Sequence, residues 1–187
     1  ALMASEILKK NKSRKIVYDI KCSNQLGEVI KENNGTPIMT KTGHSYIKSE
    51  ISKSNAILGG EMSGHIFYND NWYGFDDGIF AALKLLEILS SKESTTHEVF
   101  NKFTQLFNTP EIKIAVEDEE KFEIVEQLKV KLKPEGYDSI LIDGLRLENK
   151  DCWGLVRASN TTPSLILRFE ANTEQKLMEI QELFQKT

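Results

Sequence analysis

The feature that most constrains the fold is an alternation, in the first hundred residues, between short apolar segments and segments with helical periodicity. We expect strands at 15–20, 36–40 and 56–61, separated by helices at 23–35 and 44–55. Short apolar strands that alternate with helices are typical of βαβ units, whose strands form a parallel sheet. The sequence therefore predicts an α/β domain in its first half.

The pattern changes after two further expected helices, at 76–92 and 96–107, and a Pro-containing segment, NTPE. The expected elements beyond that point are a strand at 112–116, a helix at 119–133, a hairpin at 139–149 around Asp143-Gly144, and a closing helix at 172–186. Hairpin-paired strands with helices on one face indicate a small α+β domain. We therefore expect domains at 1–104 and 112–187, joined by a hinge or linker at 105–111.

Bulk properties exclude several classes of function. A formal net charge of −4 argues against a broad binding surface for nucleic acid or anionic membranes. The sequence contains no apolar run of about 18 residues, as a transmembrane helix requires. The chain opens without Met, within an amphipathic pattern and with no basic segment before an apolar one, so we expect part of a longer protein and no signal peptide. Cys22 and Cys152 form no C-x-x-C pair, which favours free thiols in a reducing cytoplasm.

One polar segment, GGEMSGH at 59–65, ends the third expected strand. Its glycines permit unusual backbone angles and close approach of a ligand. On extended backbone Glu61, Ser63 and His65 would share one face. A carboxylate and a hydroxyl there could bind vicinal sugar hydroxyls, and the imidazole could move protons near neutral pH. The alternative is a tight turn with solvated polar side chains.

A second polar segment, RASNTTPS at 157–164, lies between two apolar strands. One guanidinium with several hydroxyl, amide and backbone donors suits a phosphate dianion. A Ser/Asn/Thr/Pro turn beside a surface arginine is the alternative.

Lys21 and His44 each follow an expected parallel strand. Ligands collect at the carboxyl ends of such strands, so we expect Lys21, His44 and Glu61 at one rim of the sheet. For Asp76 and Asp77 a metal site or an acid pair is conceivable, but capping of the following helix explains both more simply.

Three long segments carry a family resemblance: GGEMSGH, WYGFDDGIFAALKLLEILS (72–90) and GLVRASNTTPSLILRFEANTEQKL (154–177). Together they resemble the phosphohexomutases, most closely the bacterial phosphomannomutase/phosphoglucomutase group. The resemblance implies the third and fourth domains of such an enzyme. These would be an α/β domain with a mixed, mostly parallel sheet, truncated at its N-terminus, and a small α+β domain with an antiparallel sheet.

The resemblance also implies roles for individual residues. Glu61 and Ser63 would bind sugar hydroxyls, and His65 would be a candidate proton carrier near the reacting end. Lys21 and His44 would make further contacts to the phosphosugar. The residues implied to hold the phosphate that is not being transferred are Arg157, Ser159, Asn160 and Thr161, with Thr162 supporting that loop.

The activity implied by the resemblance is interconversion of hexose 1-phosphate and hexose 6-phosphate. It would proceed through a phosphoserine and a hexose 1,6-bisphosphate intermediate, with Mg²⁺ as cofactor. The sequence contains neither the Ser-His pair of the family's nucleophile nor its Asp-Gly-Asp-Gly-Asp metal loop. We therefore expect the chain to be inactive without N-terminal domains of the same polypeptide. A non-catalytic phosphosugar-binding module and an interaction domain with a vestigial site are the alternatives.

Overall fold

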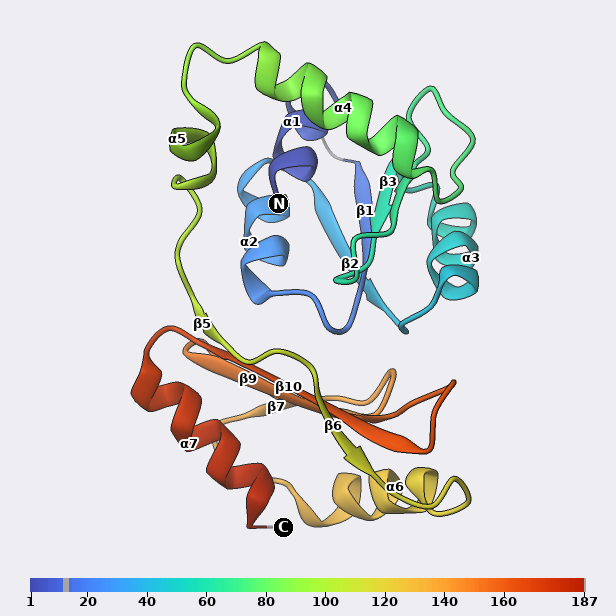
Figure 1. Cartoon of the computed structure of the whole chain (residues 1–187), viewed down its shortest axis with the longest axis vertical. Coiled ribbons are helices and arrows are strands. Elements are labelled where there is room, and N and C mark those ends of the chain that lie inside the picture. Colours follow the sequence, from blue (N-terminus) through green and yellow to red (C-terminus); the bar gives the residue numbers. More distant parts are fainter. Residues whose placement is uncertain (12–13, 187) are drawn as a thin grey trace. The chain divides into compact units, whose positions relative to one another are not determined.

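A computed structural model describes residues 1–11 and 14–186 and divides the chain into two units, Ala1–Gln105 and Leu106–Thr187 (Figure 1). Part of the expected linker, strand β5 (Phe107–Asn108), pairs with a strand of the second unit. Each unit has its own sheet and its own hydrophobic core.

The first unit contains a mixed four-stranded sheet. Its order is β2 (Thr36–Thr40), β1 (Lys15–Asp19), β3 (Leu58–Gly60) and β4 (Ile66–Tyr68). Strand β1 is parallel to β2 and to β3, whereas β4 is antiparallel to β3. The expected mixed, mostly parallel sheet is confirmed.

Alternation along β1 distributes the core over both faces of this sheet. Ile16 and Tyr18 pack in one cluster with residues of α1 (Leu2–Lys10) and α2 (Asn24–Glu32). Val17 points to the other face, where α3 (His44–Ser54) covers it. Figure 1 shows α2 and α3 on opposite sides of the strands. The carboxyl ends of β1, β2 and β3 therefore lie at one edge of a sheet that is covered on both faces.

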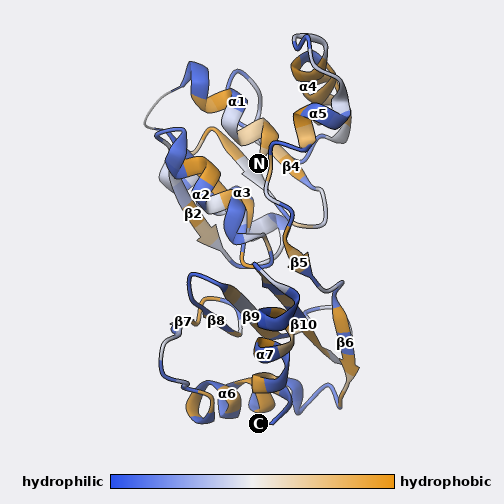
Figure 2. Cartoon of the chain, turned by 90° about the vertical axis from the view of Figure 1, so that its left-hand side faces the viewer, coloured by the Kyte–Doolittle hydropathy of each residue, from blue (hydrophilic) through white to orange (hydrophobic). Residues whose placement is uncertain are grey.

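Helix α4 (Gly78–Ser90) starts at the cap that the sequence predicts, because the Asp77 carboxylate accepts a hydrogen bond from the backbone N–H of Phe80 at 2.9 Å. Its apolar stripe differs from a usual core face: Ile79, Leu83 and Leu86 are 79%, 60% and 61% exposed. Orange hydrophobic turns on α4 are visible in Figure 2.

The next helix is shorter than expected. Helix α5 (Thr96–Phe100) starts at a capping box between Thr95 and Glu98. The prediction of a helix to residue 107 is wrong, since the chain leaves the helix at Asn101 and Phe107 joins strand β5.

The second unit is an antiparallel sheet with two helices. The order is β5, β10 (Ser164–Ala171), β9 (Cys152–Ala158), β8 (Leu145–Glu148) and β7 (Asp138–Ile140), and β6 (Ile112–Ala115) also pairs with β10. Helices α6 (Lys121–Lys131) and α7 (Glu174–Gln185) contribute Val125, Ile180 and Phe184 to one core with the strands. The expected α+β architecture is confirmed.

Two further features follow from the described residues. Each unit holds one buried free cysteine, Cys22 in the first and Cys152 in the second. In the part of the chain that the structure describes, no helix combines the length and the apolar character needed to cross a bilayer.

Candidate functional site

The segment GEMSGH forms the turn between β3 and β4, not an extended strand. The backbone N–H of Glu61 donates to the carbonyl of His65 at 2.9 Å, and that of Gly64 donates to the carbonyl of Glu61 at 3.0 Å. Gly64 has a φ of 94°, which favours glycine. The expectation that Glu61, Ser63 and His65 alternate on one face is therefore wrong. The turn instead sets Glu61 opposite His65 and leaves Ser63 exposed at its tip.

Gly59, just before this turn, is required by packing. A Cβ at this position would lie 2.6 Å from Ile51 Cδ1 and 2.9 Å from Ile47 Cγ2, both on α3. The absence of a side chain lets α3 approach β3 closely, which brings the first residue of α3, His44, to the edge of the sheet beside the turn.

His44 and His65 are in contact. Their ring centroids are 4.2 Å apart in an edge-to-face arrangement, and the ring of Phe67 packs edge-on against His44 from another side. His44 Nε2 lies 4.0 Å from Glu61 Oε1 and 3.7 Å from Asp76 Oδ2. Of the three residues expected at one rim, the structure thus places His44 and Glu61 close together.

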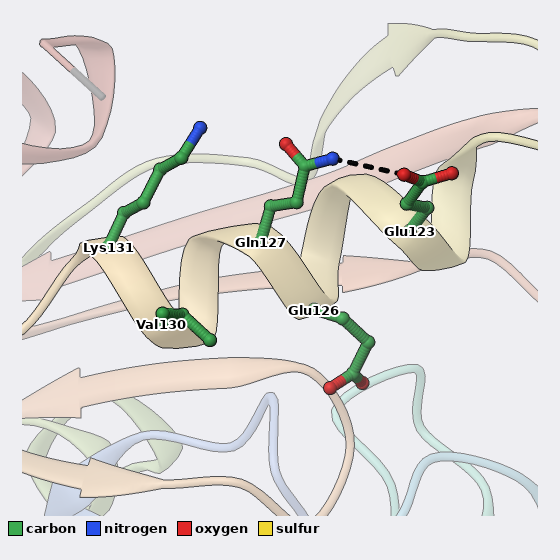
Figure 3. A pocket seen from close by; sticks show the side chains of 5 residues that line it. All are labelled: Glu123, Glu126, Gln127, Val130 and Lys131. Atoms are coloured by element: carbon green, nitrogen blue, oxygen red, sulfur yellow. Dashed lines mark hydrogen bonds between the residues drawn. The ribbon is translucent and has the colours of Figure 1, made fainter.

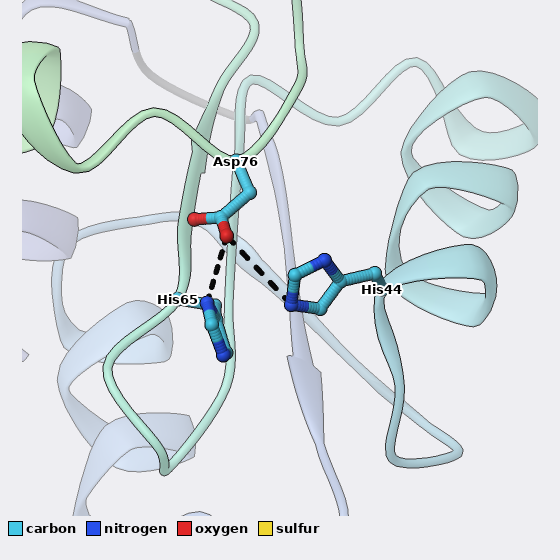
Figure 4. A group of neighbouring side chains, drawn as sticks. All are labelled: His44, His65 and Asp76. Atoms are coloured by element: carbon cyan, nitrogen blue, oxygen red, sulfur yellow. Dashed lines mark hydrogen bonds and ion pairs between the residues drawn. The ribbon is translucent and has the colours of Figure 1, made fainter.

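Asp76 is a functional candidate for which the sequence favoured a helix cap over a metal site or an acid pair. Its Oδ2 accepts a hydrogen bond from Nδ1 of His65 at 2.7 Å (Figure 4). Only Asp77 caps α4, so the interpretation of both aspartates as caps is wrong for Asp76. The backbone bridge between Phe67 and Asp76 turns the Asp76 side chain back to the sheet edge. No periodicity in the sequence signals that bridge.

Glu61 is buried, with 5% of its side chain exposed, and its Oε1 accepts no hydrogen bond from the described residues. Burial raises the pKa of this carboxyl, the nearby charge of Asp19 raises it further, and the neighbouring His44, His65 and Lys21 oppose the increase. A buried carboxylate oxygen with free acceptor capacity is the kind of group that a bound ligand hydroxyl would satisfy.

Asp19 and Lys21 lie at the carboxyl end of β1, and both are buried. Asp19 Oδ1 accepts hydrogen bonds from the backbone N–H of Met62 at 3.3 Å and from Cys22 Sγ at 3.1 Å. Asp19 therefore ties the end of β1 to the GEMSGH turn. Its place as the last residue of the strand was the available signal for this role.

In the second unit, Arg157 is held by an ion pair. It lies in β9 with 5% of its surface exposed, and its Nε donates to Asp143 Oδ2 at 2.9 Å. Nη2 lies 3.5 Å from Asp143 Oδ1. Since a guanidinium carries five N–H donors in a planar fork, this side-on pairing leaves donor capacity on its other edge.

The loop that follows Arg157 is organised around Ser159. Its Oγ accepts hydrogen bonds from the backbone N–H groups of Thr161 and Thr162 at 3.3 and 3.1 Å, and from Thr162 Oγ1 at 2.8 Å. Buried Lys121 of α6 donates to the Thr162 carbonyl at 3.3 Å. Asn160 and Thr161 are exposed at the loop tip. Ser159, Thr161 and Thr162 thus form one hydrogen-bonded loop directly after Arg157.

Two hollows lie away from these groups. One, of about 340 Å³, is lined by residues of α6 alone, and Figure 3 shows its side chains spread along that helix. The other, of about 590 Å³, lies between α1, α4 and the segment around Trp72. Neither is lined by the histidines, Glu61 or Arg157.

Family models match both units. Residues 1–107 match the α/β/α domain III of phosphoglucomutase/phosphomannomutase, and residues 111–186 match the C-terminal domain of the same enzymes.

Individual relatives agree. A phosphomannomutase/phosphoglucomutase of Pseudomonas syringae is 49% identical over 98% of this chain, and a phosphoglucomutase of Neisseria meningitidis is 46% identical over 98%. A crystal structure of a family protein from Burkholderia thailandensis superposes with a TM-score of 0.91 at 40% identity, covering 99% of this chain and 40% of that one. The chain spans 39–40% of the length of these curated relatives.

Proposed function

The chain belongs to the phosphoglucomutase/phosphomannomutase family, and from that premise we propose that it is the substrate-recognition portion of a hexose-phosphate mutase. The complete enzyme would interconvert hexose 1-phosphate and hexose 6-phosphate through a phosphoserine and a bisphosphorylated sugar. The observation that carries the proposal is the convergence of Glu61, His44, His65 and Asp76 beside the carboxyl ends of the parallel strands.

In this proposal the first unit recognises the sugar. Glu61 Oε1 accepts from a sugar hydroxyl, which supplies the hydrogen bond that this buried oxygen lacks among the described residues. Ser63 and His44 are exposed and add donors at the same edge. Lys21, at the end of β1, contributes positive charge near Glu61 for a phosphorylated ligand.

His65 is the proposed proton carrier. Because its Nδ1 donates to the carboxylate of Asp76, Nε2 is left as the unprotonated nitrogen of the neutral ring. That nitrogen can take a proton from a sugar hydroxyl that becomes a nucleophile, and can return it to the leaving oxygen in the reverse step. Asp76 acts through His65 and is therefore a positioning residue.

The second unit is proposed to hold the phosphate that is not being transferred. Arg157 offers the free edge of its guanidinium, and Ser159, Asn160 and Thr161 offer hydroxyl, amide and backbone donors in a hydrogen-bonded loop. A phosphate dianion is matched by a planar guanidinium with adjacent neutral donors. The segment 105–111 is proposed as a hinge.

The Mg²⁺ of the family has no fitting site among these residues. Mg²⁺ prefers an octahedral shell of oxygen ligands, whereas the cluster in the first unit presents two imidazoles and one carboxylate. No step performed by this chain is assigned to Mg²⁺. Without the Ser-His pair and the acidic metal loop, we expect no turnover by this chain alone.

The proposal is tested by titrating the isotope-labelled chain with glucose 1-phosphate and following backbone amide shifts. We expect shifts in 61–65 and in 157–162. Arg157→Ala should remove the second set and Glu61→Ala should weaken the first, whereas the surface variants Glu87→Ala and Lys186→Ala should bind like the parent.

Inorganic phosphate provides the ligand control and should shift only 157–162. Equal responses to phosphate and to glucose 1-phosphate, confined to 157–162, would remove the assignment of the sugar to the first unit. The absence of any shift would overturn ligand binding by this chain. Mutase turnover by the chain would contradict the expected inactivity.

A further inference from the structure

We propose that His44, His65 and Asp76 form a site for a borderline transition-metal ion such as Zn²⁺ or Co²⁺, with the buried carboxylate of Glu61 beside His44. Three donor atoms from these residues, two imidazole nitrogens and one carboxylate oxygen, all lie within 4.8 Å of one another. Figure 4 shows both imidazoles converging on one Asp76 oxygen from two different backbone segments.

The distances suit an ion between the side chains. His44 Nε2 lies 3.7 Å from Asp76 Oδ2 and 4.0 Å from Glu61 Oε1, which is too long for hydrogen bonds. Donors bound tetrahedrally to Zn²⁺ at ordinary bond lengths are separated by about 3.3 Å. The two distances from Asp76 Oδ2, 3.7 Å to His44 Nε2 and 2.7 Å to His65 Nδ1, lie on either side of that value. The ion takes the place of the proton on His65 Nδ1, which is released to solvent.

A second observation points to a ligand independently of the histidines. Glu61 Oε1 is buried, accepts no hydrogen bond from the described residues and lies beside His44. An anionic oxygen in that position gains a partner when an ion binds. His44 and His65 are 49% and 43% exposed, so an ion can enter from solvent.

The backbone holds the donors in place before an ion arrives. His65 and Glu61 are joined by a backbone hydrogen bond, Asp76 bridges to Phe67, and Phe67 packs against the ring of His44. The donor set also gives a clear selectivity: imidazole nitrogens suit Zn²⁺, Co²⁺, Ni²⁺ and Cu²⁺, whereas Mg²⁺ prefers oxygen. A bound ion would also cover His65 and Glu61, so it would compete with a sugar. This last consequence rests on the proposed function.

Co²⁺ absorption and Zn²⁺ calorimetry on the complete chain test the site. We expect one equivalent of Co²⁺ to give the intense visible bands of tetrahedral coordination, Zn²⁺ to displace it, and excess Mg²⁺ to leave the bands unchanged. His44→Ala and His65→Ala should each weaken binding by more than about tenfold, as should Asp76→Asn. The matched control is His97→Ala, since His97 lies on α5 and contacts Asn101.

Amide spectra and urea unfolding identify any variant that fails to fold, and Asp76→Asn keeps the shape of the side chain. Tetrahedral bands that survive in both folded histidine variants, or no stoichiometric binding by the parent chain, would overturn the site. Glucose 1-phosphate should release the Co²⁺. If the metal binds but the sugar phosphate neither releases it nor shifts 61–65, the site stands and the proposed sugar binding fails.

Discussion

Arg157 and Asp143 form a largely buried ion pair in which the guanidinium Nε donates to a carboxylate oxygen at 2.9 Å. The pair fixes the side chain of the arginine that is proposed to meet phosphate, and it also partly neutralises that arginine. Removing the charge of Asp143 should therefore lower the free energy of unfolding but strengthen phosphate binding.

We expect Asp143→Asn to lower the free energy of unfolding by about 1.5 kcal/mol, because a charge-assisted hydrogen bond becomes a neutral one. The same change should tighten phosphate binding about threefold, because a nearby negative charge is lost. Urea unfolding followed at Trp153, in a Trp72→Phe background, measures the first effect, and amide shifts on phosphate titration measure the second. Weaker phosphate binding would show that orientation of Arg157 outweighs its charge.

Asp76 and Asp77 are adjacent, but replacing each of them by alanine should have a different effect. Asp76→Ala should shift the His65 ring away from the tautomer protonated at Nδ1, which is measurable by nitrogen-15 shifts, since the acceptor at 2.7 Å is lost. Asp77→Ala should leave the tautomer unchanged and lower the free energy of unfolding by about 1 kcal/mol, since it removes the cap of α4. An unchanged tautomer in Asp76→Ala would remove Asp76 as a positioning residue.

The buried carboxylate of Glu61 should lower the free energy of unfolding at neutral pH. Because its pKa is raised in the folded state, the folded chain binds a proton more readily than the unfolded chain. Glu61→Gln should therefore have a higher free energy of unfolding than the parent at pH 7. The difference should disappear as the pH falls through the raised pKa toward the ordinary value of 4.5.

Glu98 provides a control in which the expected change in the free energy of unfolding has the opposite sign. Hydrogen bonds from Thr95 lower its pKa, so Glu98→Gln should be less stable than the parent at neutral pH, and the two should converge as the pH falls below 4.5. Urea unfolding at a series of pH values measures both differences. A Glu61→Gln variant less stable than the parent at pH 7 would contradict a net cost of burying the Glu61 carboxylate.

Gly144 and Gly136 offer a matched pair in the second unit. Both have positive φ, 92° and 80°, but a Cβ on Gly144 would lie 2.2 Å from the Val156 carbonyl oxygen, whereas nothing lies within 4 Å of one on Gly136. Gly136→Ala should cost about 1 kcal/mol of strain, and Gly144→Ala several times more, because the β8–β9 backbone must move. Equal losses in urea unfolding would contradict the close approach.

Local patterns predicted the elements that depend on local chemistry. The strand at 36–40 and the Asp77 cap follow from propensity and hydrogen bonding within a few residues. The end of α5 and strand β5 were missed because Phe107 leaves a helical pattern to pair with Ala171, far along the chain. Such pairing leaves no trace in the local sequence.

The candidate site divides in the same way. The positions of His44 and Glu61 at the sheet edge follow from strand order, which the alternation of elements encodes. Asp76 was considered for a metal site or an acid pair but interpreted as a cap, because its placement depends on a single backbone bridge to Phe67. The GEMSGH segment was expected to be extended, but Gly64 closes it into a turn.

Cys22 and Cys152 can also report when the unit that surrounds each of them opens. One thiol is buried in each unit, so a thiol-reactive reagent can label each only when the surrounding structure opens. Labelling rates at the two positions, measured by mass spectrometry across a urea series, count the openings of the first and the second unit separately. The ratio of the two labelling rates therefore reports whether the two units unfold together. No probe has to be introduced.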